Sequence, residues 1–138
     1  EIYTTEKIKT EKIIALIGQR QAWMSQFEIR LRKNGYEIKR FASIRDVTER
    51  INETTEESYP EFEVNAILVI DAYASNTSMT RCYGGGFNFK YINTEIIDPK
   101  KNETLATYSN SGYSENCPPS SGTIFTDVIN QLNSVFED

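Results

Sequence analysis

The chain has 138 residues, with 15 Lys and Arg, 20 Asp and Glu, no histidine and two cysteines, and its formal charge is -5 at pH 7. Without histidine, Ser-His-Asp and Cys-His catalysis and imidazole zinc sites are excluded, so any enzyme here would have to use carboxylates. The length predicts one domain, and the chain has no apolar run of about 18 residues that would predict a membrane-spanning helix.

The chain is expected to start with a flexible, polar lead-in over residues 1–11. Residues 12–18 are a short apolar run ended by glycine, which predicts a buried strand. Residues 21–34 repeat large apolar side chains at every fourth position from Trp23 to Leu31. This spacing predicts a helix with one apolar face.

A second strand, a second helix and a third strand are predicted next. Residues 36–41 alternate like a half-exposed strand, and Ser43 is expected to cap a helix over about 44–54. Residues 64–73 are the most apolar stretch of the chain. Their central residues predict a strand that is buried on both faces.

Residues 87–97 predict a strand whose pattern changes phase. Phe87, Phe89 and Tyr91 share one parity, whereas the later apolar residues, beginning with Ile92, follow the other parity. Such a change indicates a β-bulge or a strong twist near Tyr91.

The last part of the chain predicts a hairpin and a helix. Residues 98–102 have the composition of a turn, 103–109 return as a strand, and 109–122 are expected to form a loop. Residues 124–136 have the strongest helical periodicity. The predicted order is β-α-β-α-β-β-β-α. It indicates an α/β (α+β) fold in which helices pack on a mixed sheet, as a single domain over 12–138.

The two cysteines predict a cross-link. Cys82 and Cys117 both lie in stretches rich in Gly, Pro or Ser, where disulfide geometry is easily met. A disulfide is the simplest interpretation, with two unrelated free thiols as the alternative. A disulfide would indicate an oxidising compartment, and a chain that starts at Glu1 rather than Met is expected if an export signal has been removed.

Charge is unevenly distributed. Residues 1–50 contain 11 Lys and Arg and 7 Asp and Glu, whereas residues 51–138 contain 4 and 13. The acidic total argues against nucleic acid as a partner. One group of cations spans the end of the first helix and the next strand: Arg30, Arg32, Lys33, Lys39 and Arg40. We interpret it as a solvated face at a helix C-terminus, with an anionic partner or membrane surface as the alternative.

The first helix and the strand after it resemble a bacterial group. The pattern of Phe27, Leu31, Gly35, Tyr36 and Ile38 is similar to the helix-to-strand unit of envelope proteins related to the N-terminal domain of TolB, the curli secretion lipoprotein CsgG and the penicillin-binding-protein activator LpoB. The strand over 65–70 also resembles this group.

The hairpin resembles the same group, with one departure. Asp98 matches the motif, but Lys101 and Asn102 replace its Thr-Gly. Asparagine tolerates the left-handed conformation that glycine would supply, so the turn is expected to survive. The resemblance implies a location in the bacterial periplasm or outer membrane and a non-catalytic role in interaction or assembly, often as a lipoprotein with an N-terminal anchor. It implies no catalytic residue.

Aromatic residues gather around the hairpin. They are either cross-strand packing or an exposed recognition surface. The candidate partner-binding residues are Tyr73, Tyr83, Phe87, Tyr91 and Tyr113.

Three functions follow from these observations. The first is a non-catalytic factor that binds an envelope protein or a cell-wall component, and the second is a small-ligand or glycan-binding module that uses these aromatic residues. The third is a hydrolase that uses Asp71, Asp98 or Asp127, although their spacing does not require proximity. Residues 84–86 are three glycines, but a predicted strand follows them instead of a helix, and no Lys-Ser/Thr pair follows. They are therefore not a P-loop. No metal or cofactor is predicted.

Overall fold

The computed structural model describes seven main elements. The described residues are 8, 11–18, 21–41, 43, 45–47, 49, 64–74, 87–99, 101–114 and 122–136. The elements are β1 (Ile13–Gly18), α1 (Ala22–Lys33), β2 (Glu37–Phe41), β3 (Ala66–Ala74), β4 (Asn88–Asp98), β5 (Glu103–Tyr113) and α3 (Ile124–Val135). Residues 45–47 and 49 are also helical.

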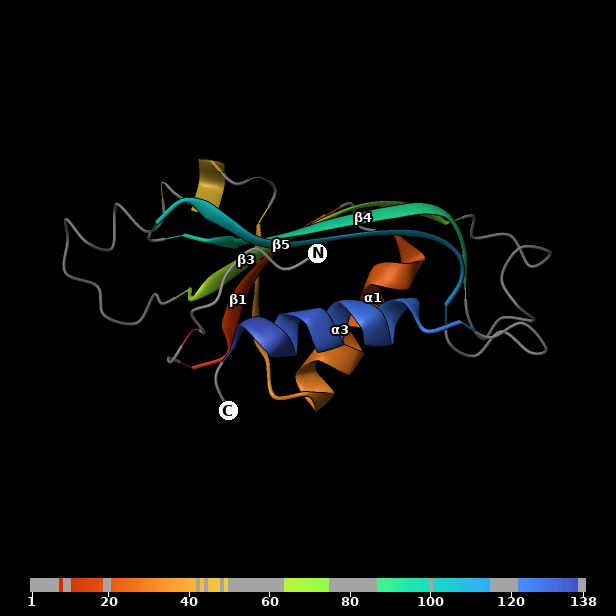
Figure 1. Ribbon diagram of the computed structural model, residues 1–138, viewed down its shortest axis with the longest axis horizontal. Coiled ribbons are helices and arrows are strands. Elements are labelled where there is room, and N and C mark those ends of the chain that lie inside the picture. Colours follow the sequence, from red (N-terminus) through yellow and green to blue (C-terminus); the bar gives the residue numbers. More distant parts are fainter. Residues whose placement is uncertain are drawn as a thin grey trace.

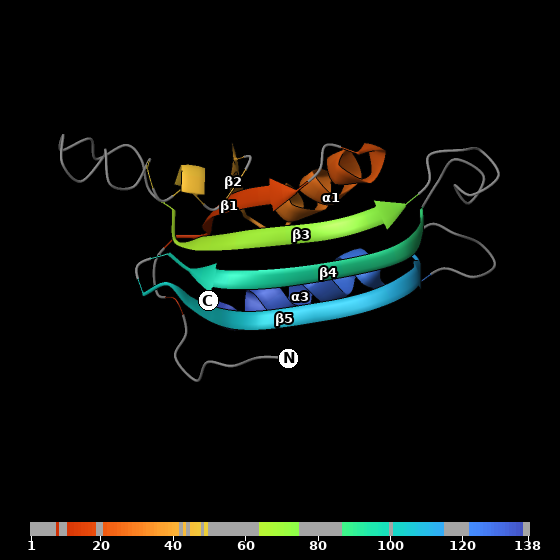
Figure 2. The same ribbon diagram turned by 90° about the horizontal axis from the view of Figure 1, so that it is seen from above.

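The strands form one mixed sheet in the order β2-β1-β3-β4-β5. β1 lies parallel to both β2 and β3, whereas β3, β4 and β5 run antiparallel to their neighbours. Both α1 and α3 cover the same face of this sheet (Figures 1 and 2). The predicted mixed-sheet α+β class is confirmed.

The hydrophobic core lies mainly between the sheet and the two helices. Trp23 of α1 packs edge-on against Phe89 of β4, with ring centroids 5.5 Å apart, and Phe89 packs against Phe125 of α3 at 5.8 Å. A smaller cluster on the opposite face joins Val47 to residues of β1 and β3, among them Ala15 and Ile67. This cluster extends to Ile97 of β4, so the described residues bury one end of the second face.

The predicted second helix is confirmed where it is described. The backbone N–H of Asp46 donates to Oγ of Ser43 over 3.2 Å, so Ser43 caps this helix as expected. The rest of 44–54 lies outside the described residues. Neither α1 nor α3, at 12 residues each, reaches the length of a membrane-spanning helix.

β5 is longer than the sequence predicted. It ends at Tyr113 rather than at residue 109, because its last residues pair with the first half of β4, including Tyr113 with Asn88 and Asn110 with Ile92. The predicted loop over 109–122 is therefore wrong in its first part.

The predicted β-bulge in β4 is confirmed at Lys90. Tyr73 of β3 pairs with Tyr91, and Ala74 pairs with Phe89, so Lys90 is the extra residue. The prediction that Tyr91 shares a face with Phe87 and Phe89 is wrong. The extra residue turns Tyr91 to the opposite face, where its side chain is exposed.

The lead-in touches the core at one point. The backbone N–H of Ile8 donates to the carbonyl of Val135 over 2.7 Å, and Ile8 pairs in parallel with Phe136. The other residues before Glu11 lie outside the described residues, so the flexibility predicted for them stays a prediction.

Candidate functional site

Among the residues that the structure describes, nothing covers the sheet face opposite α1 and α3 from Asp71 of β3 onward and over the paired parts of β4 and β5. In β3 the order Asp-Ala-Tyr-Ala turns Ala72 and Ala74 into the core and the two larger side chains outward. We call this surface the open face. Its exposed residues include Asp71, Tyr73, Tyr91, Asn93, Ser109 and Tyr113.

Tyrosines dominate the open face. Tyr73 and Tyr91 are directly opposite each other on β3 and β4 and are 46% and 40% exposed. The hydroxyl of Tyr91 donates to Oδ1 of Asp71 over 3.4 Å. Tyr113 is 42% exposed and pairs with Asn88, the exposed neighbour of buried Phe89, so it points to the same face. These rings stand on strands that are backed by the core.

A row of polar groups crosses the three strands beside the tyrosine pair. Asp71 lies opposite Asn93, which in turn lies opposite Ser109. The hydroxyl of Ser109 donates to Oδ1 of Asn93 over 2.8 Å. A carboxylate, an amide and a hydroxyl therefore present hydrogen-bonding groups side by side.

The open face also contains a carboxylate that the sequence analysis did not single out. Glu95 lies two residues beyond Asn93, so it is diagonal to Asp71 across the β3–β4 pair. Diagonal positions on paired strands lie about 7–8 Å apart, close enough for long side chains to reach each other. Glu95 is half-buried and accepts a hydrogen bond from the hydroxyl of Thr104.

The other two aspartates do not join this face. Asp98 accepts a hydrogen bond from the backbone N–H of Lys101 over 3.3 Å within the hairpin turn. Asp127 lies on α3, on the covered side of the sheet, where the hydroxyl of Tyr108 donates to it over 3.0 Å. Asp71 and Asp127 therefore lie on opposite sides of the sheet and do not form a pair.

The five candidate partner-binding residues do not all lie on one surface. Tyr73, Tyr91 and Tyr113 are exposed together on the open face. Phe87 is only 1% exposed, because it belongs to the core and its backbone N–H donates to Oγ of Ser114. Its assignment to a binding surface is therefore wrong. Tyr83 lies outside the described residues.

The predicted disulfide is not described. Both Cys82 and Cys117 lie outside the described residues, so their pairing stays a prediction. Among the residues that are described, no three carboxylates are grouped as a metal site.

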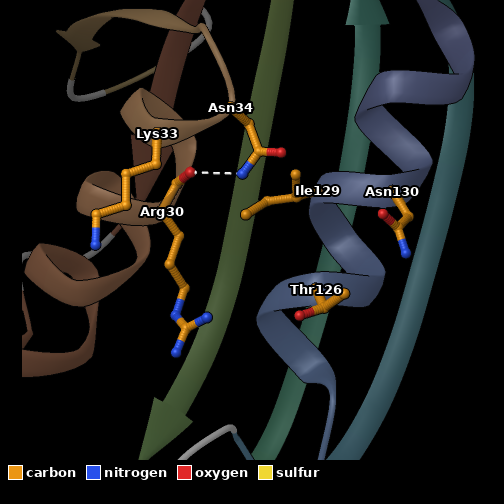
Figure 3. Close-up of a pocket in the computed structure, with 6 residues that line it drawn as sticks. All are labelled: Arg30, Lys33, Asn34, Thr126, Ile129 and Asn130. Atoms are coloured by element: carbon orange, nitrogen blue, oxygen red, sulfur yellow. Dashed lines mark hydrogen bonds between the residues drawn. The ribbon is translucent and has the colours of Figure 1, made fainter.

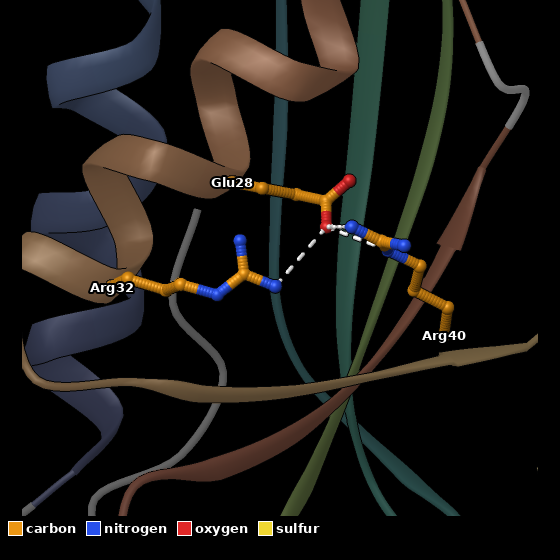
Figure 4. A network of polar contacts seen from close by, with 3 residues as sticks. All are labelled: Glu28, Arg32 and Arg40. Carbon is orange, nitrogen blue, oxygen red and sulfur yellow. Dashed lines mark hydrogen bonds and ion pairs between the residues drawn. The ribbon is translucent and has the colours of Figure 1, made fainter.

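Three of the five cations of the predicted cluster form ion pairs with two glutamates. Oε2 of the buried Glu28 accepts hydrogen bonds from Nε and Nη2 of Arg40, both over 2.7 Å, and lies 3.6 Å from Nη2 of Arg32 (Figure 4). Lys39 pairs with Glu37 over 3.7 Å. Glu28 was missed by the sequence analysis, although its spacing from Arg32 is that of a helical ion pair.

Comparison with solved structures gives similarities of low sequence identity. No protein-family model and no curated protein matches the sequence. A lipoprotein of Neisseria meningitidis is 14% identical, with a TM-score of 0.39, 91% of this chain covered and 99% of that one. PelC of Paraburkholderia phytofirmans, solved as a dodecamer, is 12% identical, with a TM-score of 0.47 and coverages of 99% and 98%.

TolB of Acinetobacter baumannii is 14% identical with a TM-score of 0.49, and this chain covers 32% of its length. With these identities and with TM-scores of 0.49 or lower, the similarities establish neither family membership nor function for this chain.

Proposed function

We propose that this chain is a non-catalytic binding domain of the bacterial envelope that holds a cell-wall glycan on the open face. One observation carries the proposal. The exposed pair Tyr73 and Tyr91 lies next to the polar row of Asp71, Asn93 and Ser109 on a rigid sheet.

This combination matches the chemistry of a sugar chain. A pyranose ring has apolar C–H faces that pack on aromatic rings, and its edge carries hydroxyls that donate to carboxylates and amides. The tyrosine pair provides the first kind of contact and the polar row the second. Both lie in one surface, so one or two sugar units would engage them together.

A glycan fits this surface better than a protein partner does. A protein that buried the polar row would have to satisfy the carboxylate of Asp71 and the amide of Asn93, since unpaired buried polar groups are costly. A glycan brings hydroxyls for them. The tyrosines alone do not distinguish a glycan from a protein partner, because tyrosines are also common in protein interfaces.

The envelope location is supported by the sequence resemblance of the first helix and the hairpin to envelope proteins. The non-catalytic part is supported by the separation of Asp71, Asp98 and Asp127. Asp71 and Glu95 are the pair that a glycosidase on the open face would use. Substitution of these residues therefore tests whether the domain is non-catalytic.

The binding test uses purified cell-wall sacculi and soluble muropeptides. The chain is expected to co-sediment with sacculi and to give a saturable calorimetric signal with muropeptides. Replacing both tyrosines (Tyr73→Ala with Tyr91→Ala) is expected to weaken binding by at least about thirtyfold, because each anchoring ring at a binding surface contributes ~1–2 kcal/mol. Ile29→Ala is the matched control, since Ile29 is 50% exposed on α1, on the other side of the sheet.

Four results would contradict the proposal. The first is that the parent chain binds no glycan, and the second is that the tyrosine variant binds as well as the Ile29 variant. The third is retention by sacculi that is lost when bound proteins are stripped from them, which would assign the open face to a protein partner. The fourth is the release of new reducing ends by the parent chain but not by Glu95→Gln, which would make the domain a hydrolase.

A further inference from the structure

A small pocket lies on the other side of the sheet, between the end of α1 and the middle of α3. It has a volume of about 160 Å³. Its lining consists of Arg30, Lys33, Asn34, Thr126, Ile129 and Asn130. Figure 3 shows the guanidinium of Arg30 and the hydroxyl of Thr126 facing each other across the gap between the helices, with Ile129 beside them. None of the described residues that line it is a carboxylate.

The two cations of this pocket differ from their neighbours. On α1 and β2, Arg32 and Arg40 contact Glu28, and Lys39 contacts Glu37. Among the described residues, no carboxylate forms an ion pair with Arg30 or Lys33. Five cations and two glutamates leave three positive charges uncompensated in this cluster, and Arg30 and Lys33 carry two of them.

Arg30 is held in position by an aromatic ring. Its guanidinium carbon lies 5.8 Å from the ring centroid of Phe125, which is a favourable cation–π distance. Phe125 is 1% exposed and is packed against Phe27 and Phe89, so it cannot move away. The guanidinium thus has a preferred place from which its N–H groups can bind a ligand.

The C-terminal end of a helix normally repels anions, but here its carbonyls are occupied. The backbone N–H of Asn34 and its side-chain amide both donate to the carbonyl of Arg30, over 3.2 and 2.8 Å. The backbone N–H of Gly35 donates to the carbonyl of Arg32 over 3.0 Å. These donors offset part of the negative end of the helix dipole beside the pocket.

We propose that this pocket binds a small oxyanion, the carboxylate or phosphate group of a small molecule. Arg30 provides the planar pair of donors that fits such a group, and the hydroxyl of Thr126 faces it across the gap (Figure 3). Lys33 adds positive charge to this end of α1, with its ammonium pointing away from α3 (Figure 3), and Ile129 offers an apolar contact to the rest of the ligand. This site is independent of the glycan surface, since it lies on the covered side of the sheet.

The test is a ¹H–¹⁵N NMR titration with inorganic phosphate and, separately, with acetate, at constant ionic strength maintained with chloride. Saturable shifts are expected at the amides of Thr126 and Asn130 and at the Nε–H of Arg30. Arg30→Gln is expected to weaken the response about tenfold or more, because a charge-assisted, bidentate contact is lost. Arg30→Lys, which keeps the charge but not the fork, is expected to be intermediate.

Lys101→Gln is the matched control, because it removes one positive charge from the exposed hairpin turn and is expected to change the affinity less than about twofold. The same spectra show whether each variant is folded. A response to phosphate alone identifies a phosphate group as the ligand, and a response to acetate alone identifies a carboxylate. Shifts that never saturate, or that are equal in Arg30→Gln and Lys101→Gln, would overturn the proposal.

Discussion

Glu28 shows how one buried charge joins two elements. It projects from α1 and is 1% exposed, yet it contacts Arg40 on β2, the edge strand of the sheet. A buried carboxylate is costly unless it is paired, so the residues that contact it contribute to stability through it. The arginine that was expected to be part of a solvated cationic face therefore has a structural role.

Replacing Arg40 is expected to destabilise the protein more than replacing another exposed arginine does. Arg40→Met removes two short hydrogen bonds to a buried carboxylate and is expected to lower the free energy of unfolding by about 2 kcal/mol. Arg45→Met is the control, because Arg45 and Glu49 form an ion pair in which both side chains are largely exposed, and it is expected to cost less than about 1 kcal/mol. Urea unfolding measures both, and equal losses would contradict this role for Glu28.

Asn102 shows what can be predicted for single residues. Its φ of 53° is left-handed, as expected from its place in the motif where related hairpins have glycine. This conformation is local and follows from residue type. The side of the sheet to which Tyr91 points does not follow from residue type. It depends on which residue of β4 has no partner on the paired strand β3.

The bulge in β4 decides which aromatic residues are inside the protein. With Lys90 as an extra residue, Phe87 and Phe89 reach the core while Tyr91 stays on the open face. Without it, the residues on one side of the bulge would face the wrong way, since strand side chains alternate.

Deleting Lys90 is therefore expected to be far more damaging than replacing it. The deletion would turn either Phe87 and Phe89 or Tyr91 to the wrong face of the sheet. The free energy of unfolding is expected to fall by at least about 3 kcal/mol, the order of a lost buried phenylalanine. Lys90→Ala keeps the extra residue and is expected to change stability by less than about 0.5 kcal/mol, because Lys90 is exposed. A deletion variant as stable as Lys90→Ala in thermal unfolding would show that the bulge is not required.

Strands and helices were predictable where the signal is local. The apolar runs before Gly18 and around Leu68, and the helical periodicity of α1 and α3, gave elements that the structure confirms within one or two residues. The end of β5 was not predictable, because its last residues are fixed by pairing with β4 rather than by their own polar composition. The alternation from Asp71 to Ala74 was a signal for the open face that the apolar run before it concealed.

At the scale of the molecule, one sheet separates two surfaces of different chemistry. The open face carries tyrosines, Asp71 and Asn93, whereas the covered side carries the pocket of Arg30 between the helices. The pocket could not be predicted from the sequence, because α1 and α3 lie at opposite ends of the chain and meet only through the core. The open face could be predicted only in part, since its tyrosines were identified but its flatness and its polar row depend on strand order.

The strand order also determines how far apart in sequence the contacts of this fold are. β4 and β5 pair through a short turn, with Asp98 opposite Glu103, whereas the inner strand β1 pairs with the central strand β3 by bringing Ile14 to Ala66. Because closing a long loop costs more entropy, the hairpin is expected to form early in the folding transition state and the parallel pairs late. The chain's only tryptophan, Trp23, reports the later step, since it packs on Phe89 once α1 docks.

Two matched substitutions test this order of folding. Ile96 of β4 and Ile14 of β1 are both fully buried. Ile96→Val is expected to slow refolding and to give a high φ-value, whereas Ile14→Val is expected mainly to speed unfolding. Stopped-flow tryptophan fluorescence over a range of urea concentrations gives both rates. A φ-value for Ile14→Val as high as that for Ile96→Val would mean that the long parallel pairing, with its high contact order, is already in place when the chain crosses its folding barrier.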